Sequence, residues 1–171
     1  MKNMYGQTLV EMMSCLLILG TILTSAITTL PSLLRSHQQT QAVNQLVGAL
    51  HYARAVAVLE RTTVTLCPGK EQCERTRIWQ GQLLAFTDLN LNGQLDVDEK
   101  LLQQLPLQTG HSWQWSSFRN RPYIQLEADG TTRALNGTLT LCHRGIPTKQ
   151  VVVNLTGRAR TQIAPTETIC R

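Results

Sequence analysis

The sequence predicts an α+β protein in which one long N-terminal helix packs on an antiparallel β-sheet head. Two observations carry this prediction. Up to Glu60 the chain shows a long uncharged apolar run followed by a helical repeat, and from residue 62 onward short β-forming runs alternate with turn residues. A chain of 171 residues suits one modest domain plus an extended helix rather than two full domains.

The helix contains an apolar run from residue 12 to residue 34 without a charged side chain. Its 23 residues would cover roughly 34 Å as a helix, enough to cross the hydrocarbon core of a bilayer. We therefore expect a transmembrane helix over residues 7–34. A secretory signal peptide, cleaved within the small-residue segment 24–30, is the alternative that hydrophobicity alone leaves open.

Beyond this run the helix is expected to continue as an amphipathic segment over residues 35–60. Apolar side chains recur there every three to four residues, with polar residues between them. They are Val43, Leu46, Leu50, Ala53 and Ala57. The repeat ends near Glu60, where a Thr-rich, β-forming run begins. The second half of the helix is therefore predicted to lie against the head.

The head, over residues 61–171, is predicted to consist of short antiparallel strands. β-branched and aromatic residues form short runs separated by turn signals such as Asn136-Gly137. The runs lie at residues 63–66, 83–87, 101–105, 112–118, 123–126, 138–142, 150–155 and 158–163. Trp113 and Trp115 are two residues apart, so they share one face of a strand and are expected in the core.

The charge of the chain is uneven along its length. The formal net charge is +5, and residues 100–171 carry nine basic and three acidic side chains, a net of +6. Residues 61–99 carry four basic and six acidic side chains, a net of −2. This asymmetry points to a polyanionic partner for the C-terminal part, although simple solubility explains it as well.

Four of the five cysteines lie outside the apolar run, which suits an oxidising compartment. Four cysteines allow three pairings, and we favour Cys67–Cys73 with Cys142–Cys170 because the first two are so close in sequence. A zinc site is the rival interpretation, but neither pair has the CxxC spacing and only His143 lies adjacent. Cys15 lies inside the apolar run without an evident partner.

Residues 88–99 match the calcium-loop pattern D-x-N-x-N-G-x5-E, with oxygen-bearing side chains from Asp88 to Glu99 and Gly93 at the sixth position. The residues before Asp88 form a β-like run, so the helix that normally flanks such a loop is missing. Bonds from Asp and Asn side chains to the backbone explain the pattern as a turn without any metal. The pattern leaves both uses open, and we predict neither a metal site nor a cofactor.

The sequence lacks the motifs of the common enzyme classes. It contains no G-x-S-x-G, no H-E-x-x-H and no phosphate-binding loop, and its four histidines are scattered. We therefore expect a protein that is not an enzyme.

The first eleven residues order their features in a specific way: a short basic leader ends at Gly6, then Gln7-Thr8-Leu9-Val10-Glu11 leads into the apolar run. This start resembles the prepilin signal of type IV pilins, with Gln7 where most members have Phe. The resemblance implies a pilin-like fold and a leader of residues 1–6. It further implies that a prepilin peptidase cleaves between Gly6 and Gln7 and that Gln7 is N-methylated. Glu11 would pair with the new N-terminal amine during filament assembly, and a carboxylate at the head of a bilayer helix is a functional candidate by itself.

Near the C-terminus, Gly157-Arg158-Ala159-Arg160 follows a predicted strand. Gly157 can take the positive φ of a tight turn, and Arg158 and Arg160 would leave one face of an extended chain. Supported by Arg144 and Lys149, they would form a cationic tip. Guanidinium groups bind phosphates in fork geometry, so this tip could hold a nucleic-acid backbone without reading its sequence.

A Gly-Arg-x-Arg motif at this place resembles the FimT family of DNA-binding minor pilins, within the wider FimT/FimU and GspH group. The resemblance implies a minor type IV pilin that binds DNA through Arg158 and Arg160 and supports DNA uptake in natural transformation. It would be anchored in the inner membrane with a periplasmic head before joining other pilins in a filament. The alternative is a structural minor pilin or type II secretion pseudopilin that primes filament assembly without binding DNA.

Overall fold

The computed structural model describes residues 8–170, apart from the side chains of residues 25–29. Along the chain the helix α1 (Leu9–Glu60) comes first, and nine strands follow. They are β1 (Val64–Pro68), β2 (Ile78–Trp79), β3 (Gln82–Thr87), β4 (Leu101–Pro106), β5 (His111–Ser117), β6 (Ile124–Leu126), β7 (Gly137–His143), β8 (Ile146–Val153) and β9 (Ala159–Ile163). The chain divides into two compact units, Met1–Gln38 and Gln39–Arg171.

The first unit contains the N-terminal part of α1. The large apolar side chains described there are exposed, among them Leu9, Leu16, Ile22 and Leu33. Within residues 8–170, no helix offers a stretch that is both long and apolar enough to cross a membrane. Glu11 lies in the first turn of α1, whereas Gly6 and Gln7, with the predicted leader and cleavage site, lie outside the described residues.

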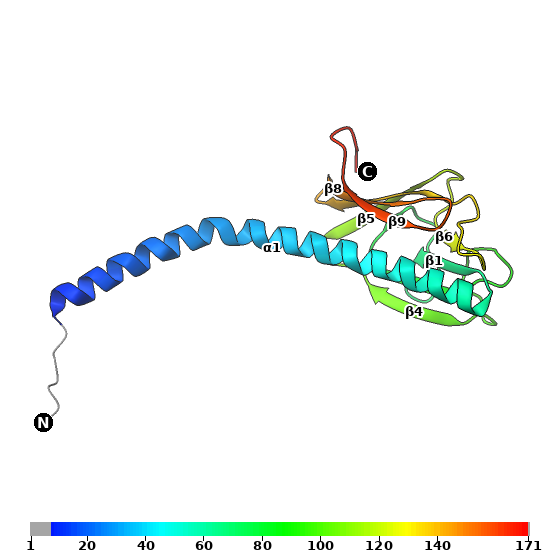
Figure 1. Cartoon of the computed structure of the whole chain (residues 1–171), viewed down its shortest axis with the longest axis horizontal. Helices are drawn as coiled ribbons and strands as arrows, with labels where there is room; N and C mark the ends of the chain where they lie inside the picture. Colours follow the sequence, from blue (N-terminus) through cyan, green and yellow to red (C-terminus); the bar gives the residue numbers. More distant parts are fainter. Residues whose placement is uncertain (1–7, 171) are drawn as a thin grey trace, which may run out of the picture. The chain divides into compact units, whose positions relative to one another are not determined.

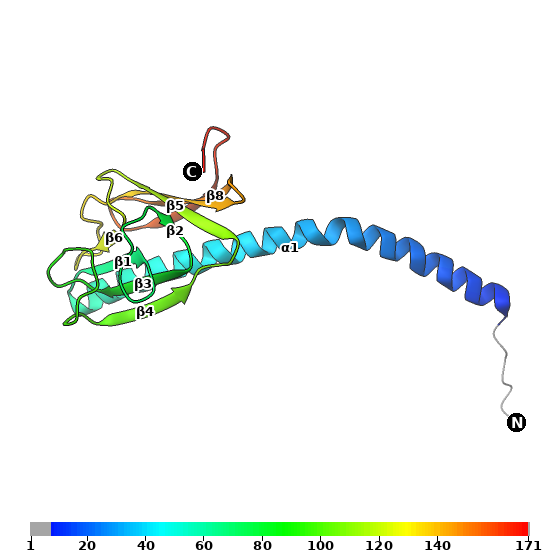
Figure 2. The ribbon, with the colours of Figure 1, turned by 180° about the vertical axis from the view of Figure 1, so that it is seen from behind.

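In the second unit the strands form two antiparallel sheets. One sheet has the order β4-β3-β1-β6, and the other has the order β2-β5-β7-β8-β9. Both sheets pack against the C-terminal half of α1, as the two opposite views in Figures 1 and 2 show. The predicted strands are all present, shifted by a few residues at their ends. Strand β2 was missed because two residues are too short to show a pattern.

One apolar core joins the helix to both sheets. The five residues of the predicted helical repeat, from Val43 to Ala57, are all buried in it. Trp113 and Trp115 are also buried, as the sequence predicted, and Trp79 of β2 packs with its ring centroid 6.1 Å from that of Trp115. Burial of this helix face against both sheets therefore holds the C-terminal half of α1 and the head together.

Two disulfides close loops of the head. Cys67 bonds Cys73 with an S–S distance of 2.01 Å, and Cys142 bonds Cys170 with an S–S distance of 1.97 Å. These are the pairs that the sequence favoured, and all four sulfurs are thereby removed from the alternative zinc site. Cys15 is exposed on α1.

Candidate functional site

The candidate motif forms the turn of the β8–β9 hairpin. Gly157 has a φ of 71°, and its N–H donates to the Asn154 carbonyl over 3.0 Å. The Asn154 side chain accepts a second bond, from the Arg158 N–H, over 2.9 Å. Asn154 therefore closes the turn from both its backbone and its side chain, and it holds the backbone of Arg158 directly before β9.

Gly157 also meets a close backbone neighbour. A Cβ atom at this position would overlap the carbonyl oxygen of Gly130, which lies in another turn of the head. The same carbonyl accepts a bond from Arg54 Nε of α1 over 2.9 Å. Glycine is thus required at position 157 for two reasons: its positive φ and its close approach to the Gly130 carbonyl. Because Arg54 bonds the same carbonyl, Gly130 links the hairpin turn to the helix.

Arg158, directly before β9, and Arg160, within β9, point to the same side. Ala159 between them packs against the core, so its two neighbours point to the opposite, outer face of the five-stranded sheet. Arg160 stands opposite Val152 of β8. Both arginines are exposed, and within residues 8–170 no hydrogen bond or salt bridge of either side chain is found. Both charges are therefore available to a partner.

The two basic residues predicted to support the motif lie elsewhere. Arg144 is in the β7–β8 turn, at the far end of β8, which at about 3.3 Å per residue is roughly 23 Å from the β8–β9 turn. Lys149 pairs with Ile163, and its Nζ donates to Thr40 Oγ1 of α1 over 3.0 Å. The predicted single cationic tip is therefore reduced to Arg158 and Arg160.

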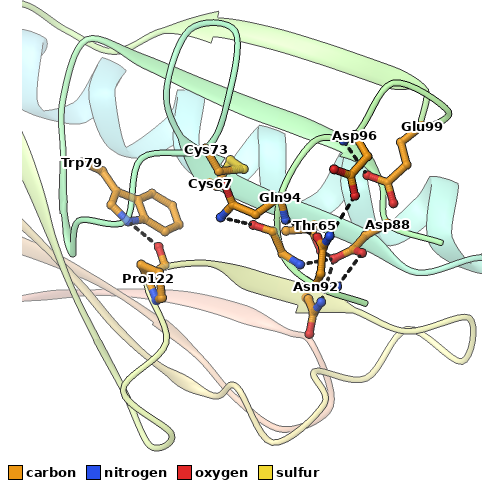
Figure 3. The surroundings of a disulfide bond; sticks show 12 residues. Thr65, Cys67, Cys73, Trp79, Asp88, Asn92, Gln94, Asp96, Glu99 and Pro122 are labelled. Carbon is orange, nitrogen blue, oxygen red and sulfur yellow. Dashed lines mark hydrogen bonds between the residues drawn. A yellow bond between two sulfur atoms is a disulfide. The ribbon is translucent and has the colours of Figure 1, made fainter. Parts of the chain in front are cut away.

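The calcium-like loop is organised around a buried carboxylate. Asp88 is fully buried and accepts bonds from Thr65 Oγ1 at 2.6 Å and Gln125 Nε2 at 2.7 Å. It also accepts the backbone N–H groups of Asn92 at 3.1 Å and Gly93 at 3.0 Å (Figure 3). Both oxygens of Asp88 thus point to donors of the protein itself.

Two further acidic side chains of the loop, Asp96 and Glu99, are engaged in the same way. Glu99 accepts the N–H groups of Leu89 at 2.8 Å and Asp96 at 3.1 Å. Asp96 Oδ2 accepts the side-chain amides of Asn90 and Asn92, each at 2.8 Å. Within the described chain, no three His, Cys, Asp or Glu residues are arranged to hold a metal ion. The geometry supports the turn interpretation of this loop.

Two histidine rings, those of His111 and His143, lie against each other where β5 begins. The ring centroids of His111 and His143 are 4.6 Å apart, and the two residues pair across β5 and β7. Burial lowers the pKa of His111 below its usual value, a bond to the Thr109 carbonyl opposes this, and the neighbouring His143 lowers it further. The structure therefore favours an uncharged His111.

A second group of basic side chains was not singled out from the sequence. Arg77 Nη1 donates to Asn120 Oδ1, which places Arg77 beside the β5–β6 loop containing Arg119 and Arg121. All three arginines are exposed. The pattern Phe118-Arg119-Asn120-Arg121 was the available signal, because two arginines flank a residue suited to a tight turn. Asn120 indeed has a φ of 56°.

Comparison with known proteins shows a match to a family model and a similarity to solved structures. The model described as type II transport protein GspH matches residues 42–157, and it ends just before the two arginines of the hairpin. No curated protein matches the chain.

Two crystal structures of the type IV minor pilin FimU of Pseudomonas aeruginosa, strain PAO1, in different crystal forms, are similar to this chain. One gives a TM-score of 0.57 at 19% identity, over 79% of this chain and 93% of that chain. The other gives 0.54 at 19% identity, over 76% and 95%. At this identity the likeness shows the fold alone.

Proposed function

We propose, from the premise that this chain belongs to the GspH family, that it is a minor type IV pilin that binds DNA non-specifically through Arg158 and Arg160. As a family member it is a minor pilin or pseudopilin and not an enzyme, and it assembles with other pilins. The pilin-like α+β fold expected from the sequence is confirmed. The finer proposal, closest to the FimT family, concerns DNA uptake in natural transformation.

The observation that supports DNA binding is the pair of exposed arginines on one face of β9. The turn before them is closed by Asn154 and packed against Gly130, so the backbone that carries both guanidinium groups is held before any ligand arrives. Guanidinium groups match phosphate oxygens in fork geometry, and contacts to phosphates carry no sequence information. We therefore propose binding that is independent of base sequence and weakened by salt.

Removing both charges should weaken DNA binding by roughly tenfold, since exposed charge contacts contribute up to about 1 kcal/mol each. With duplex DNA, the slope of log K against log salt should also fall by about 1.8, because two phosphate contacts are lost. The test is fluorescence anisotropy with labelled DNA and the full chain in a non-ionic detergent, comparing wild type with Arg158→Ala/Arg160→Ala.

The matched control is Lys70→Ala/Arg144→Ala, which removes the same charge from exposed residues away from β9. This control should bind DNA nearly as the wild type does. Equal losses in both double variants would mean that only net charge matters, and the proposed site would be rejected.

The alternative is a structural minor pilin or type II secretion pseudopilin that primes filament assembly without binding DNA. The observation in its favour is that the matched family model describes a type II transport protein and ends at residue 157. Wild-type protein that fails to bind DNA even at low salt would support this alternative.

The N-terminal part of the proposal concerns maturation and location. We propose cleavage between Gly6 and Gln7, methylation of Gln7, and pairing of Glu11 with the new amine of the same or a neighbouring subunit. The exposed apolar side chains at the start of α1 need a cover, which lipid and then other pilins would supply. The two disulfides suit a periplasmic head. The mass of the mature chain tests the cut, and a chain of full length would contradict it.

A further inference from the structure

The outer face of the five-stranded sheet joins the arginines of β9 to the opposite edge. Cross-strand pairing aligns Ser116, Thr138, Val152 and Arg160 in one row over β5, β7, β8 and β9. Three spacings of about 4.8 Å place the ends of this row roughly 14 Å apart. Paired residues share a face, so Ser116 lies on the same outer face as Arg160.

Phe118 continues this face beyond the end of β5. Trp113 and Trp115 point into the core, so the alternating residues Ser116 and Phe118 point outward. The Phe118 N–H donates to the Asn136 carbonyl over 3.0 Å, which extends the β5–β7 pairing by one step. The Phe118 side chain is 81% exposed, although a phenyl ring is normally buried. An aromatic ring therefore stands open at this edge.

Three arginines belong to, or contact, the loop that begins at Phe118. Arg119 and Arg121 follow Phe118 in the loop, and Arg77 reaches the loop through Asn120. The loop is closed by Ser117, whose Oγ accepts the Arg121 N–H over 3.1 Å and donates to the Arg121 carbonyl over 3.3 Å. The bonds of Ser117 thus hold the loop that carries Arg119 and Arg121, and Asn120 of this loop holds Arg77.

Three adjoining hollows connect the two edges. A hollow of about 650 Å³ is lined by Arg75, Arg77 and Ser116, and it shares Ser116 with a second hollow of about 280 Å³. The second shares Thr138 with a third of about 410 Å³, which reaches the β8–β9 turn at Thr156. Uncharged Ser, Thr and Gln make up most of the lining of the second hollow, whereas Gly137, Val152, Val153 and Leu155 make up half of the lining of the third. Among the described residues that line the three hollows, Glu167 of the first hollow is the only acidic one.

We propose that Phe118, Arg119 and Arg121, together with Arg77, form a second DNA-contact region, connected to Arg158 and Arg160 by the uncharged second and third hollows. The inference rests on the proposed DNA binding and deepens it. Basic side chains beside an exposed aromatic ring are an arrangement that binds single-stranded nucleic acid, because the backbone follows the charge and an unpaired base stacks on the ring. The second region thus gives the protein a preference for single-stranded DNA.

The test uses the full chain in non-ionic detergent and labelled DNA of about 16 nucleotides, single-stranded or duplex. Arg119→Gln/Arg121→Gln should weaken binding about five- to tenfold and lower the salt slope by about 1.4 for the single strand and about 1.8 for the duplex. Phe118→Ala should weaken binding of the single strand at least about fivefold and leave duplex binding within about twofold, whereas Phe118→Trp should retain both. The matched control for charge is Lys70→Gln/Arg144→Gln, and melting curves of every variant establish folding.

The outcomes separate this inference from the function on which it rests. If wild type binds no DNA, the proposed function fails, and the second region fails with it. If binding depends on Arg158 and Arg160 but is unchanged in Arg119→Gln/Arg121→Gln, the second region is rejected and the proposed function stands. An equal loss of single-strand and duplex binding in Phe118→Ala would reject the stacking role.

Discussion

Asp88→Ala should lower the free energy of unfolding by about 3–5 kcal/mol, because it removes a fully buried carboxylate that organises its surroundings. Four donors lose their acceptor in this variant: the Thr65 hydroxyl, the Gln125 amide and the N–H groups of Asn92 and Gly93. Thr65 and Gln125 are buried themselves, so water cannot readily replace the lost bonds. The measurement is denaturant-induced unfolding, with the midpoint and the slope compared between variant and wild type.

Asp98→Ala is the matched control for Asp88→Ala. Asp98 belongs to the same loop and has the same charge, but its side chain is exposed. Its replacement should change the free energy of unfolding by less than about 0.5 kcal/mol. A loss of under about 1 kcal/mol for Asp88→Ala would show that the buried network stabilises the head far less than its geometry indicates.

Cys142→Ser/Cys170→Ser should cost about 3–4 kcal/mol of stability, the second large effect. The bond joins residues 28 positions apart, and a loop of this length restricts the unfolded chain strongly in the chain-entropy model. The pair Cys67–Cys73, with a separation of 6, should cost less when removed, about 2 kcal/mol. Unfolding under oxidising conditions measures both, and Cys15→Ser, at an exposed position, serves as the control.

Loss of the Cys142–Cys170 bond should leave DNA binding nearly unchanged well below the unfolding midpoint. Arg160 is held by the pairing of β9 with β8, which runs from Lys149↔Ile163 to Val153↔Ala159, and Arg158 by the turn at Asn154. Neither restraint involves the bond. If the Cys67–Cys73 bond instead proves the more costly one to remove, unfolded-state entropy is the wrong explanation, and lost packing at the buried Cys67 and Cys73 decides instead.

Local patterns predicted most of the fold because they reflect burial within one element. The repeat from Val43 to Ala57 predicted the helix face that both sheets cover, and alternation placed Trp113 and Trp115 in the core. Strand β2 was not predicted, because its two residues are held by pairing with Gln114 and Trp113 of β5, which is distant in the sequence. Pairing of that kind leaves no local signal.

The candidate site was predicted only in part, for the same physical reason. The pattern around Gly157 predicted a turn with both arginines on one face, which depends on residues next to each other in the chain. Grouping Arg144 and Lys149 with them relied on sequence proximity, and β8 separates Arg144 from that turn by its own length. In contrast, Arg77 and Asn120 meet although 43 positions separate them.

The sequence by itself determined the helix, most of the strands, the favoured disulfide pairs and the two arginines that follow Gly157, because each depends on local spacing or on residue chemistry. Only the tertiary structure decided what surrounds them. It brought Thr65 and Gln125 to Asp88, so that a calcium-like loop is closed by the protein's own donors. It also aligned Ser116 with Arg160 across four strands. Antiparallel pairing sets which distant residues become neighbours, and the long-range packing that selects the pairing is not contained in any short segment.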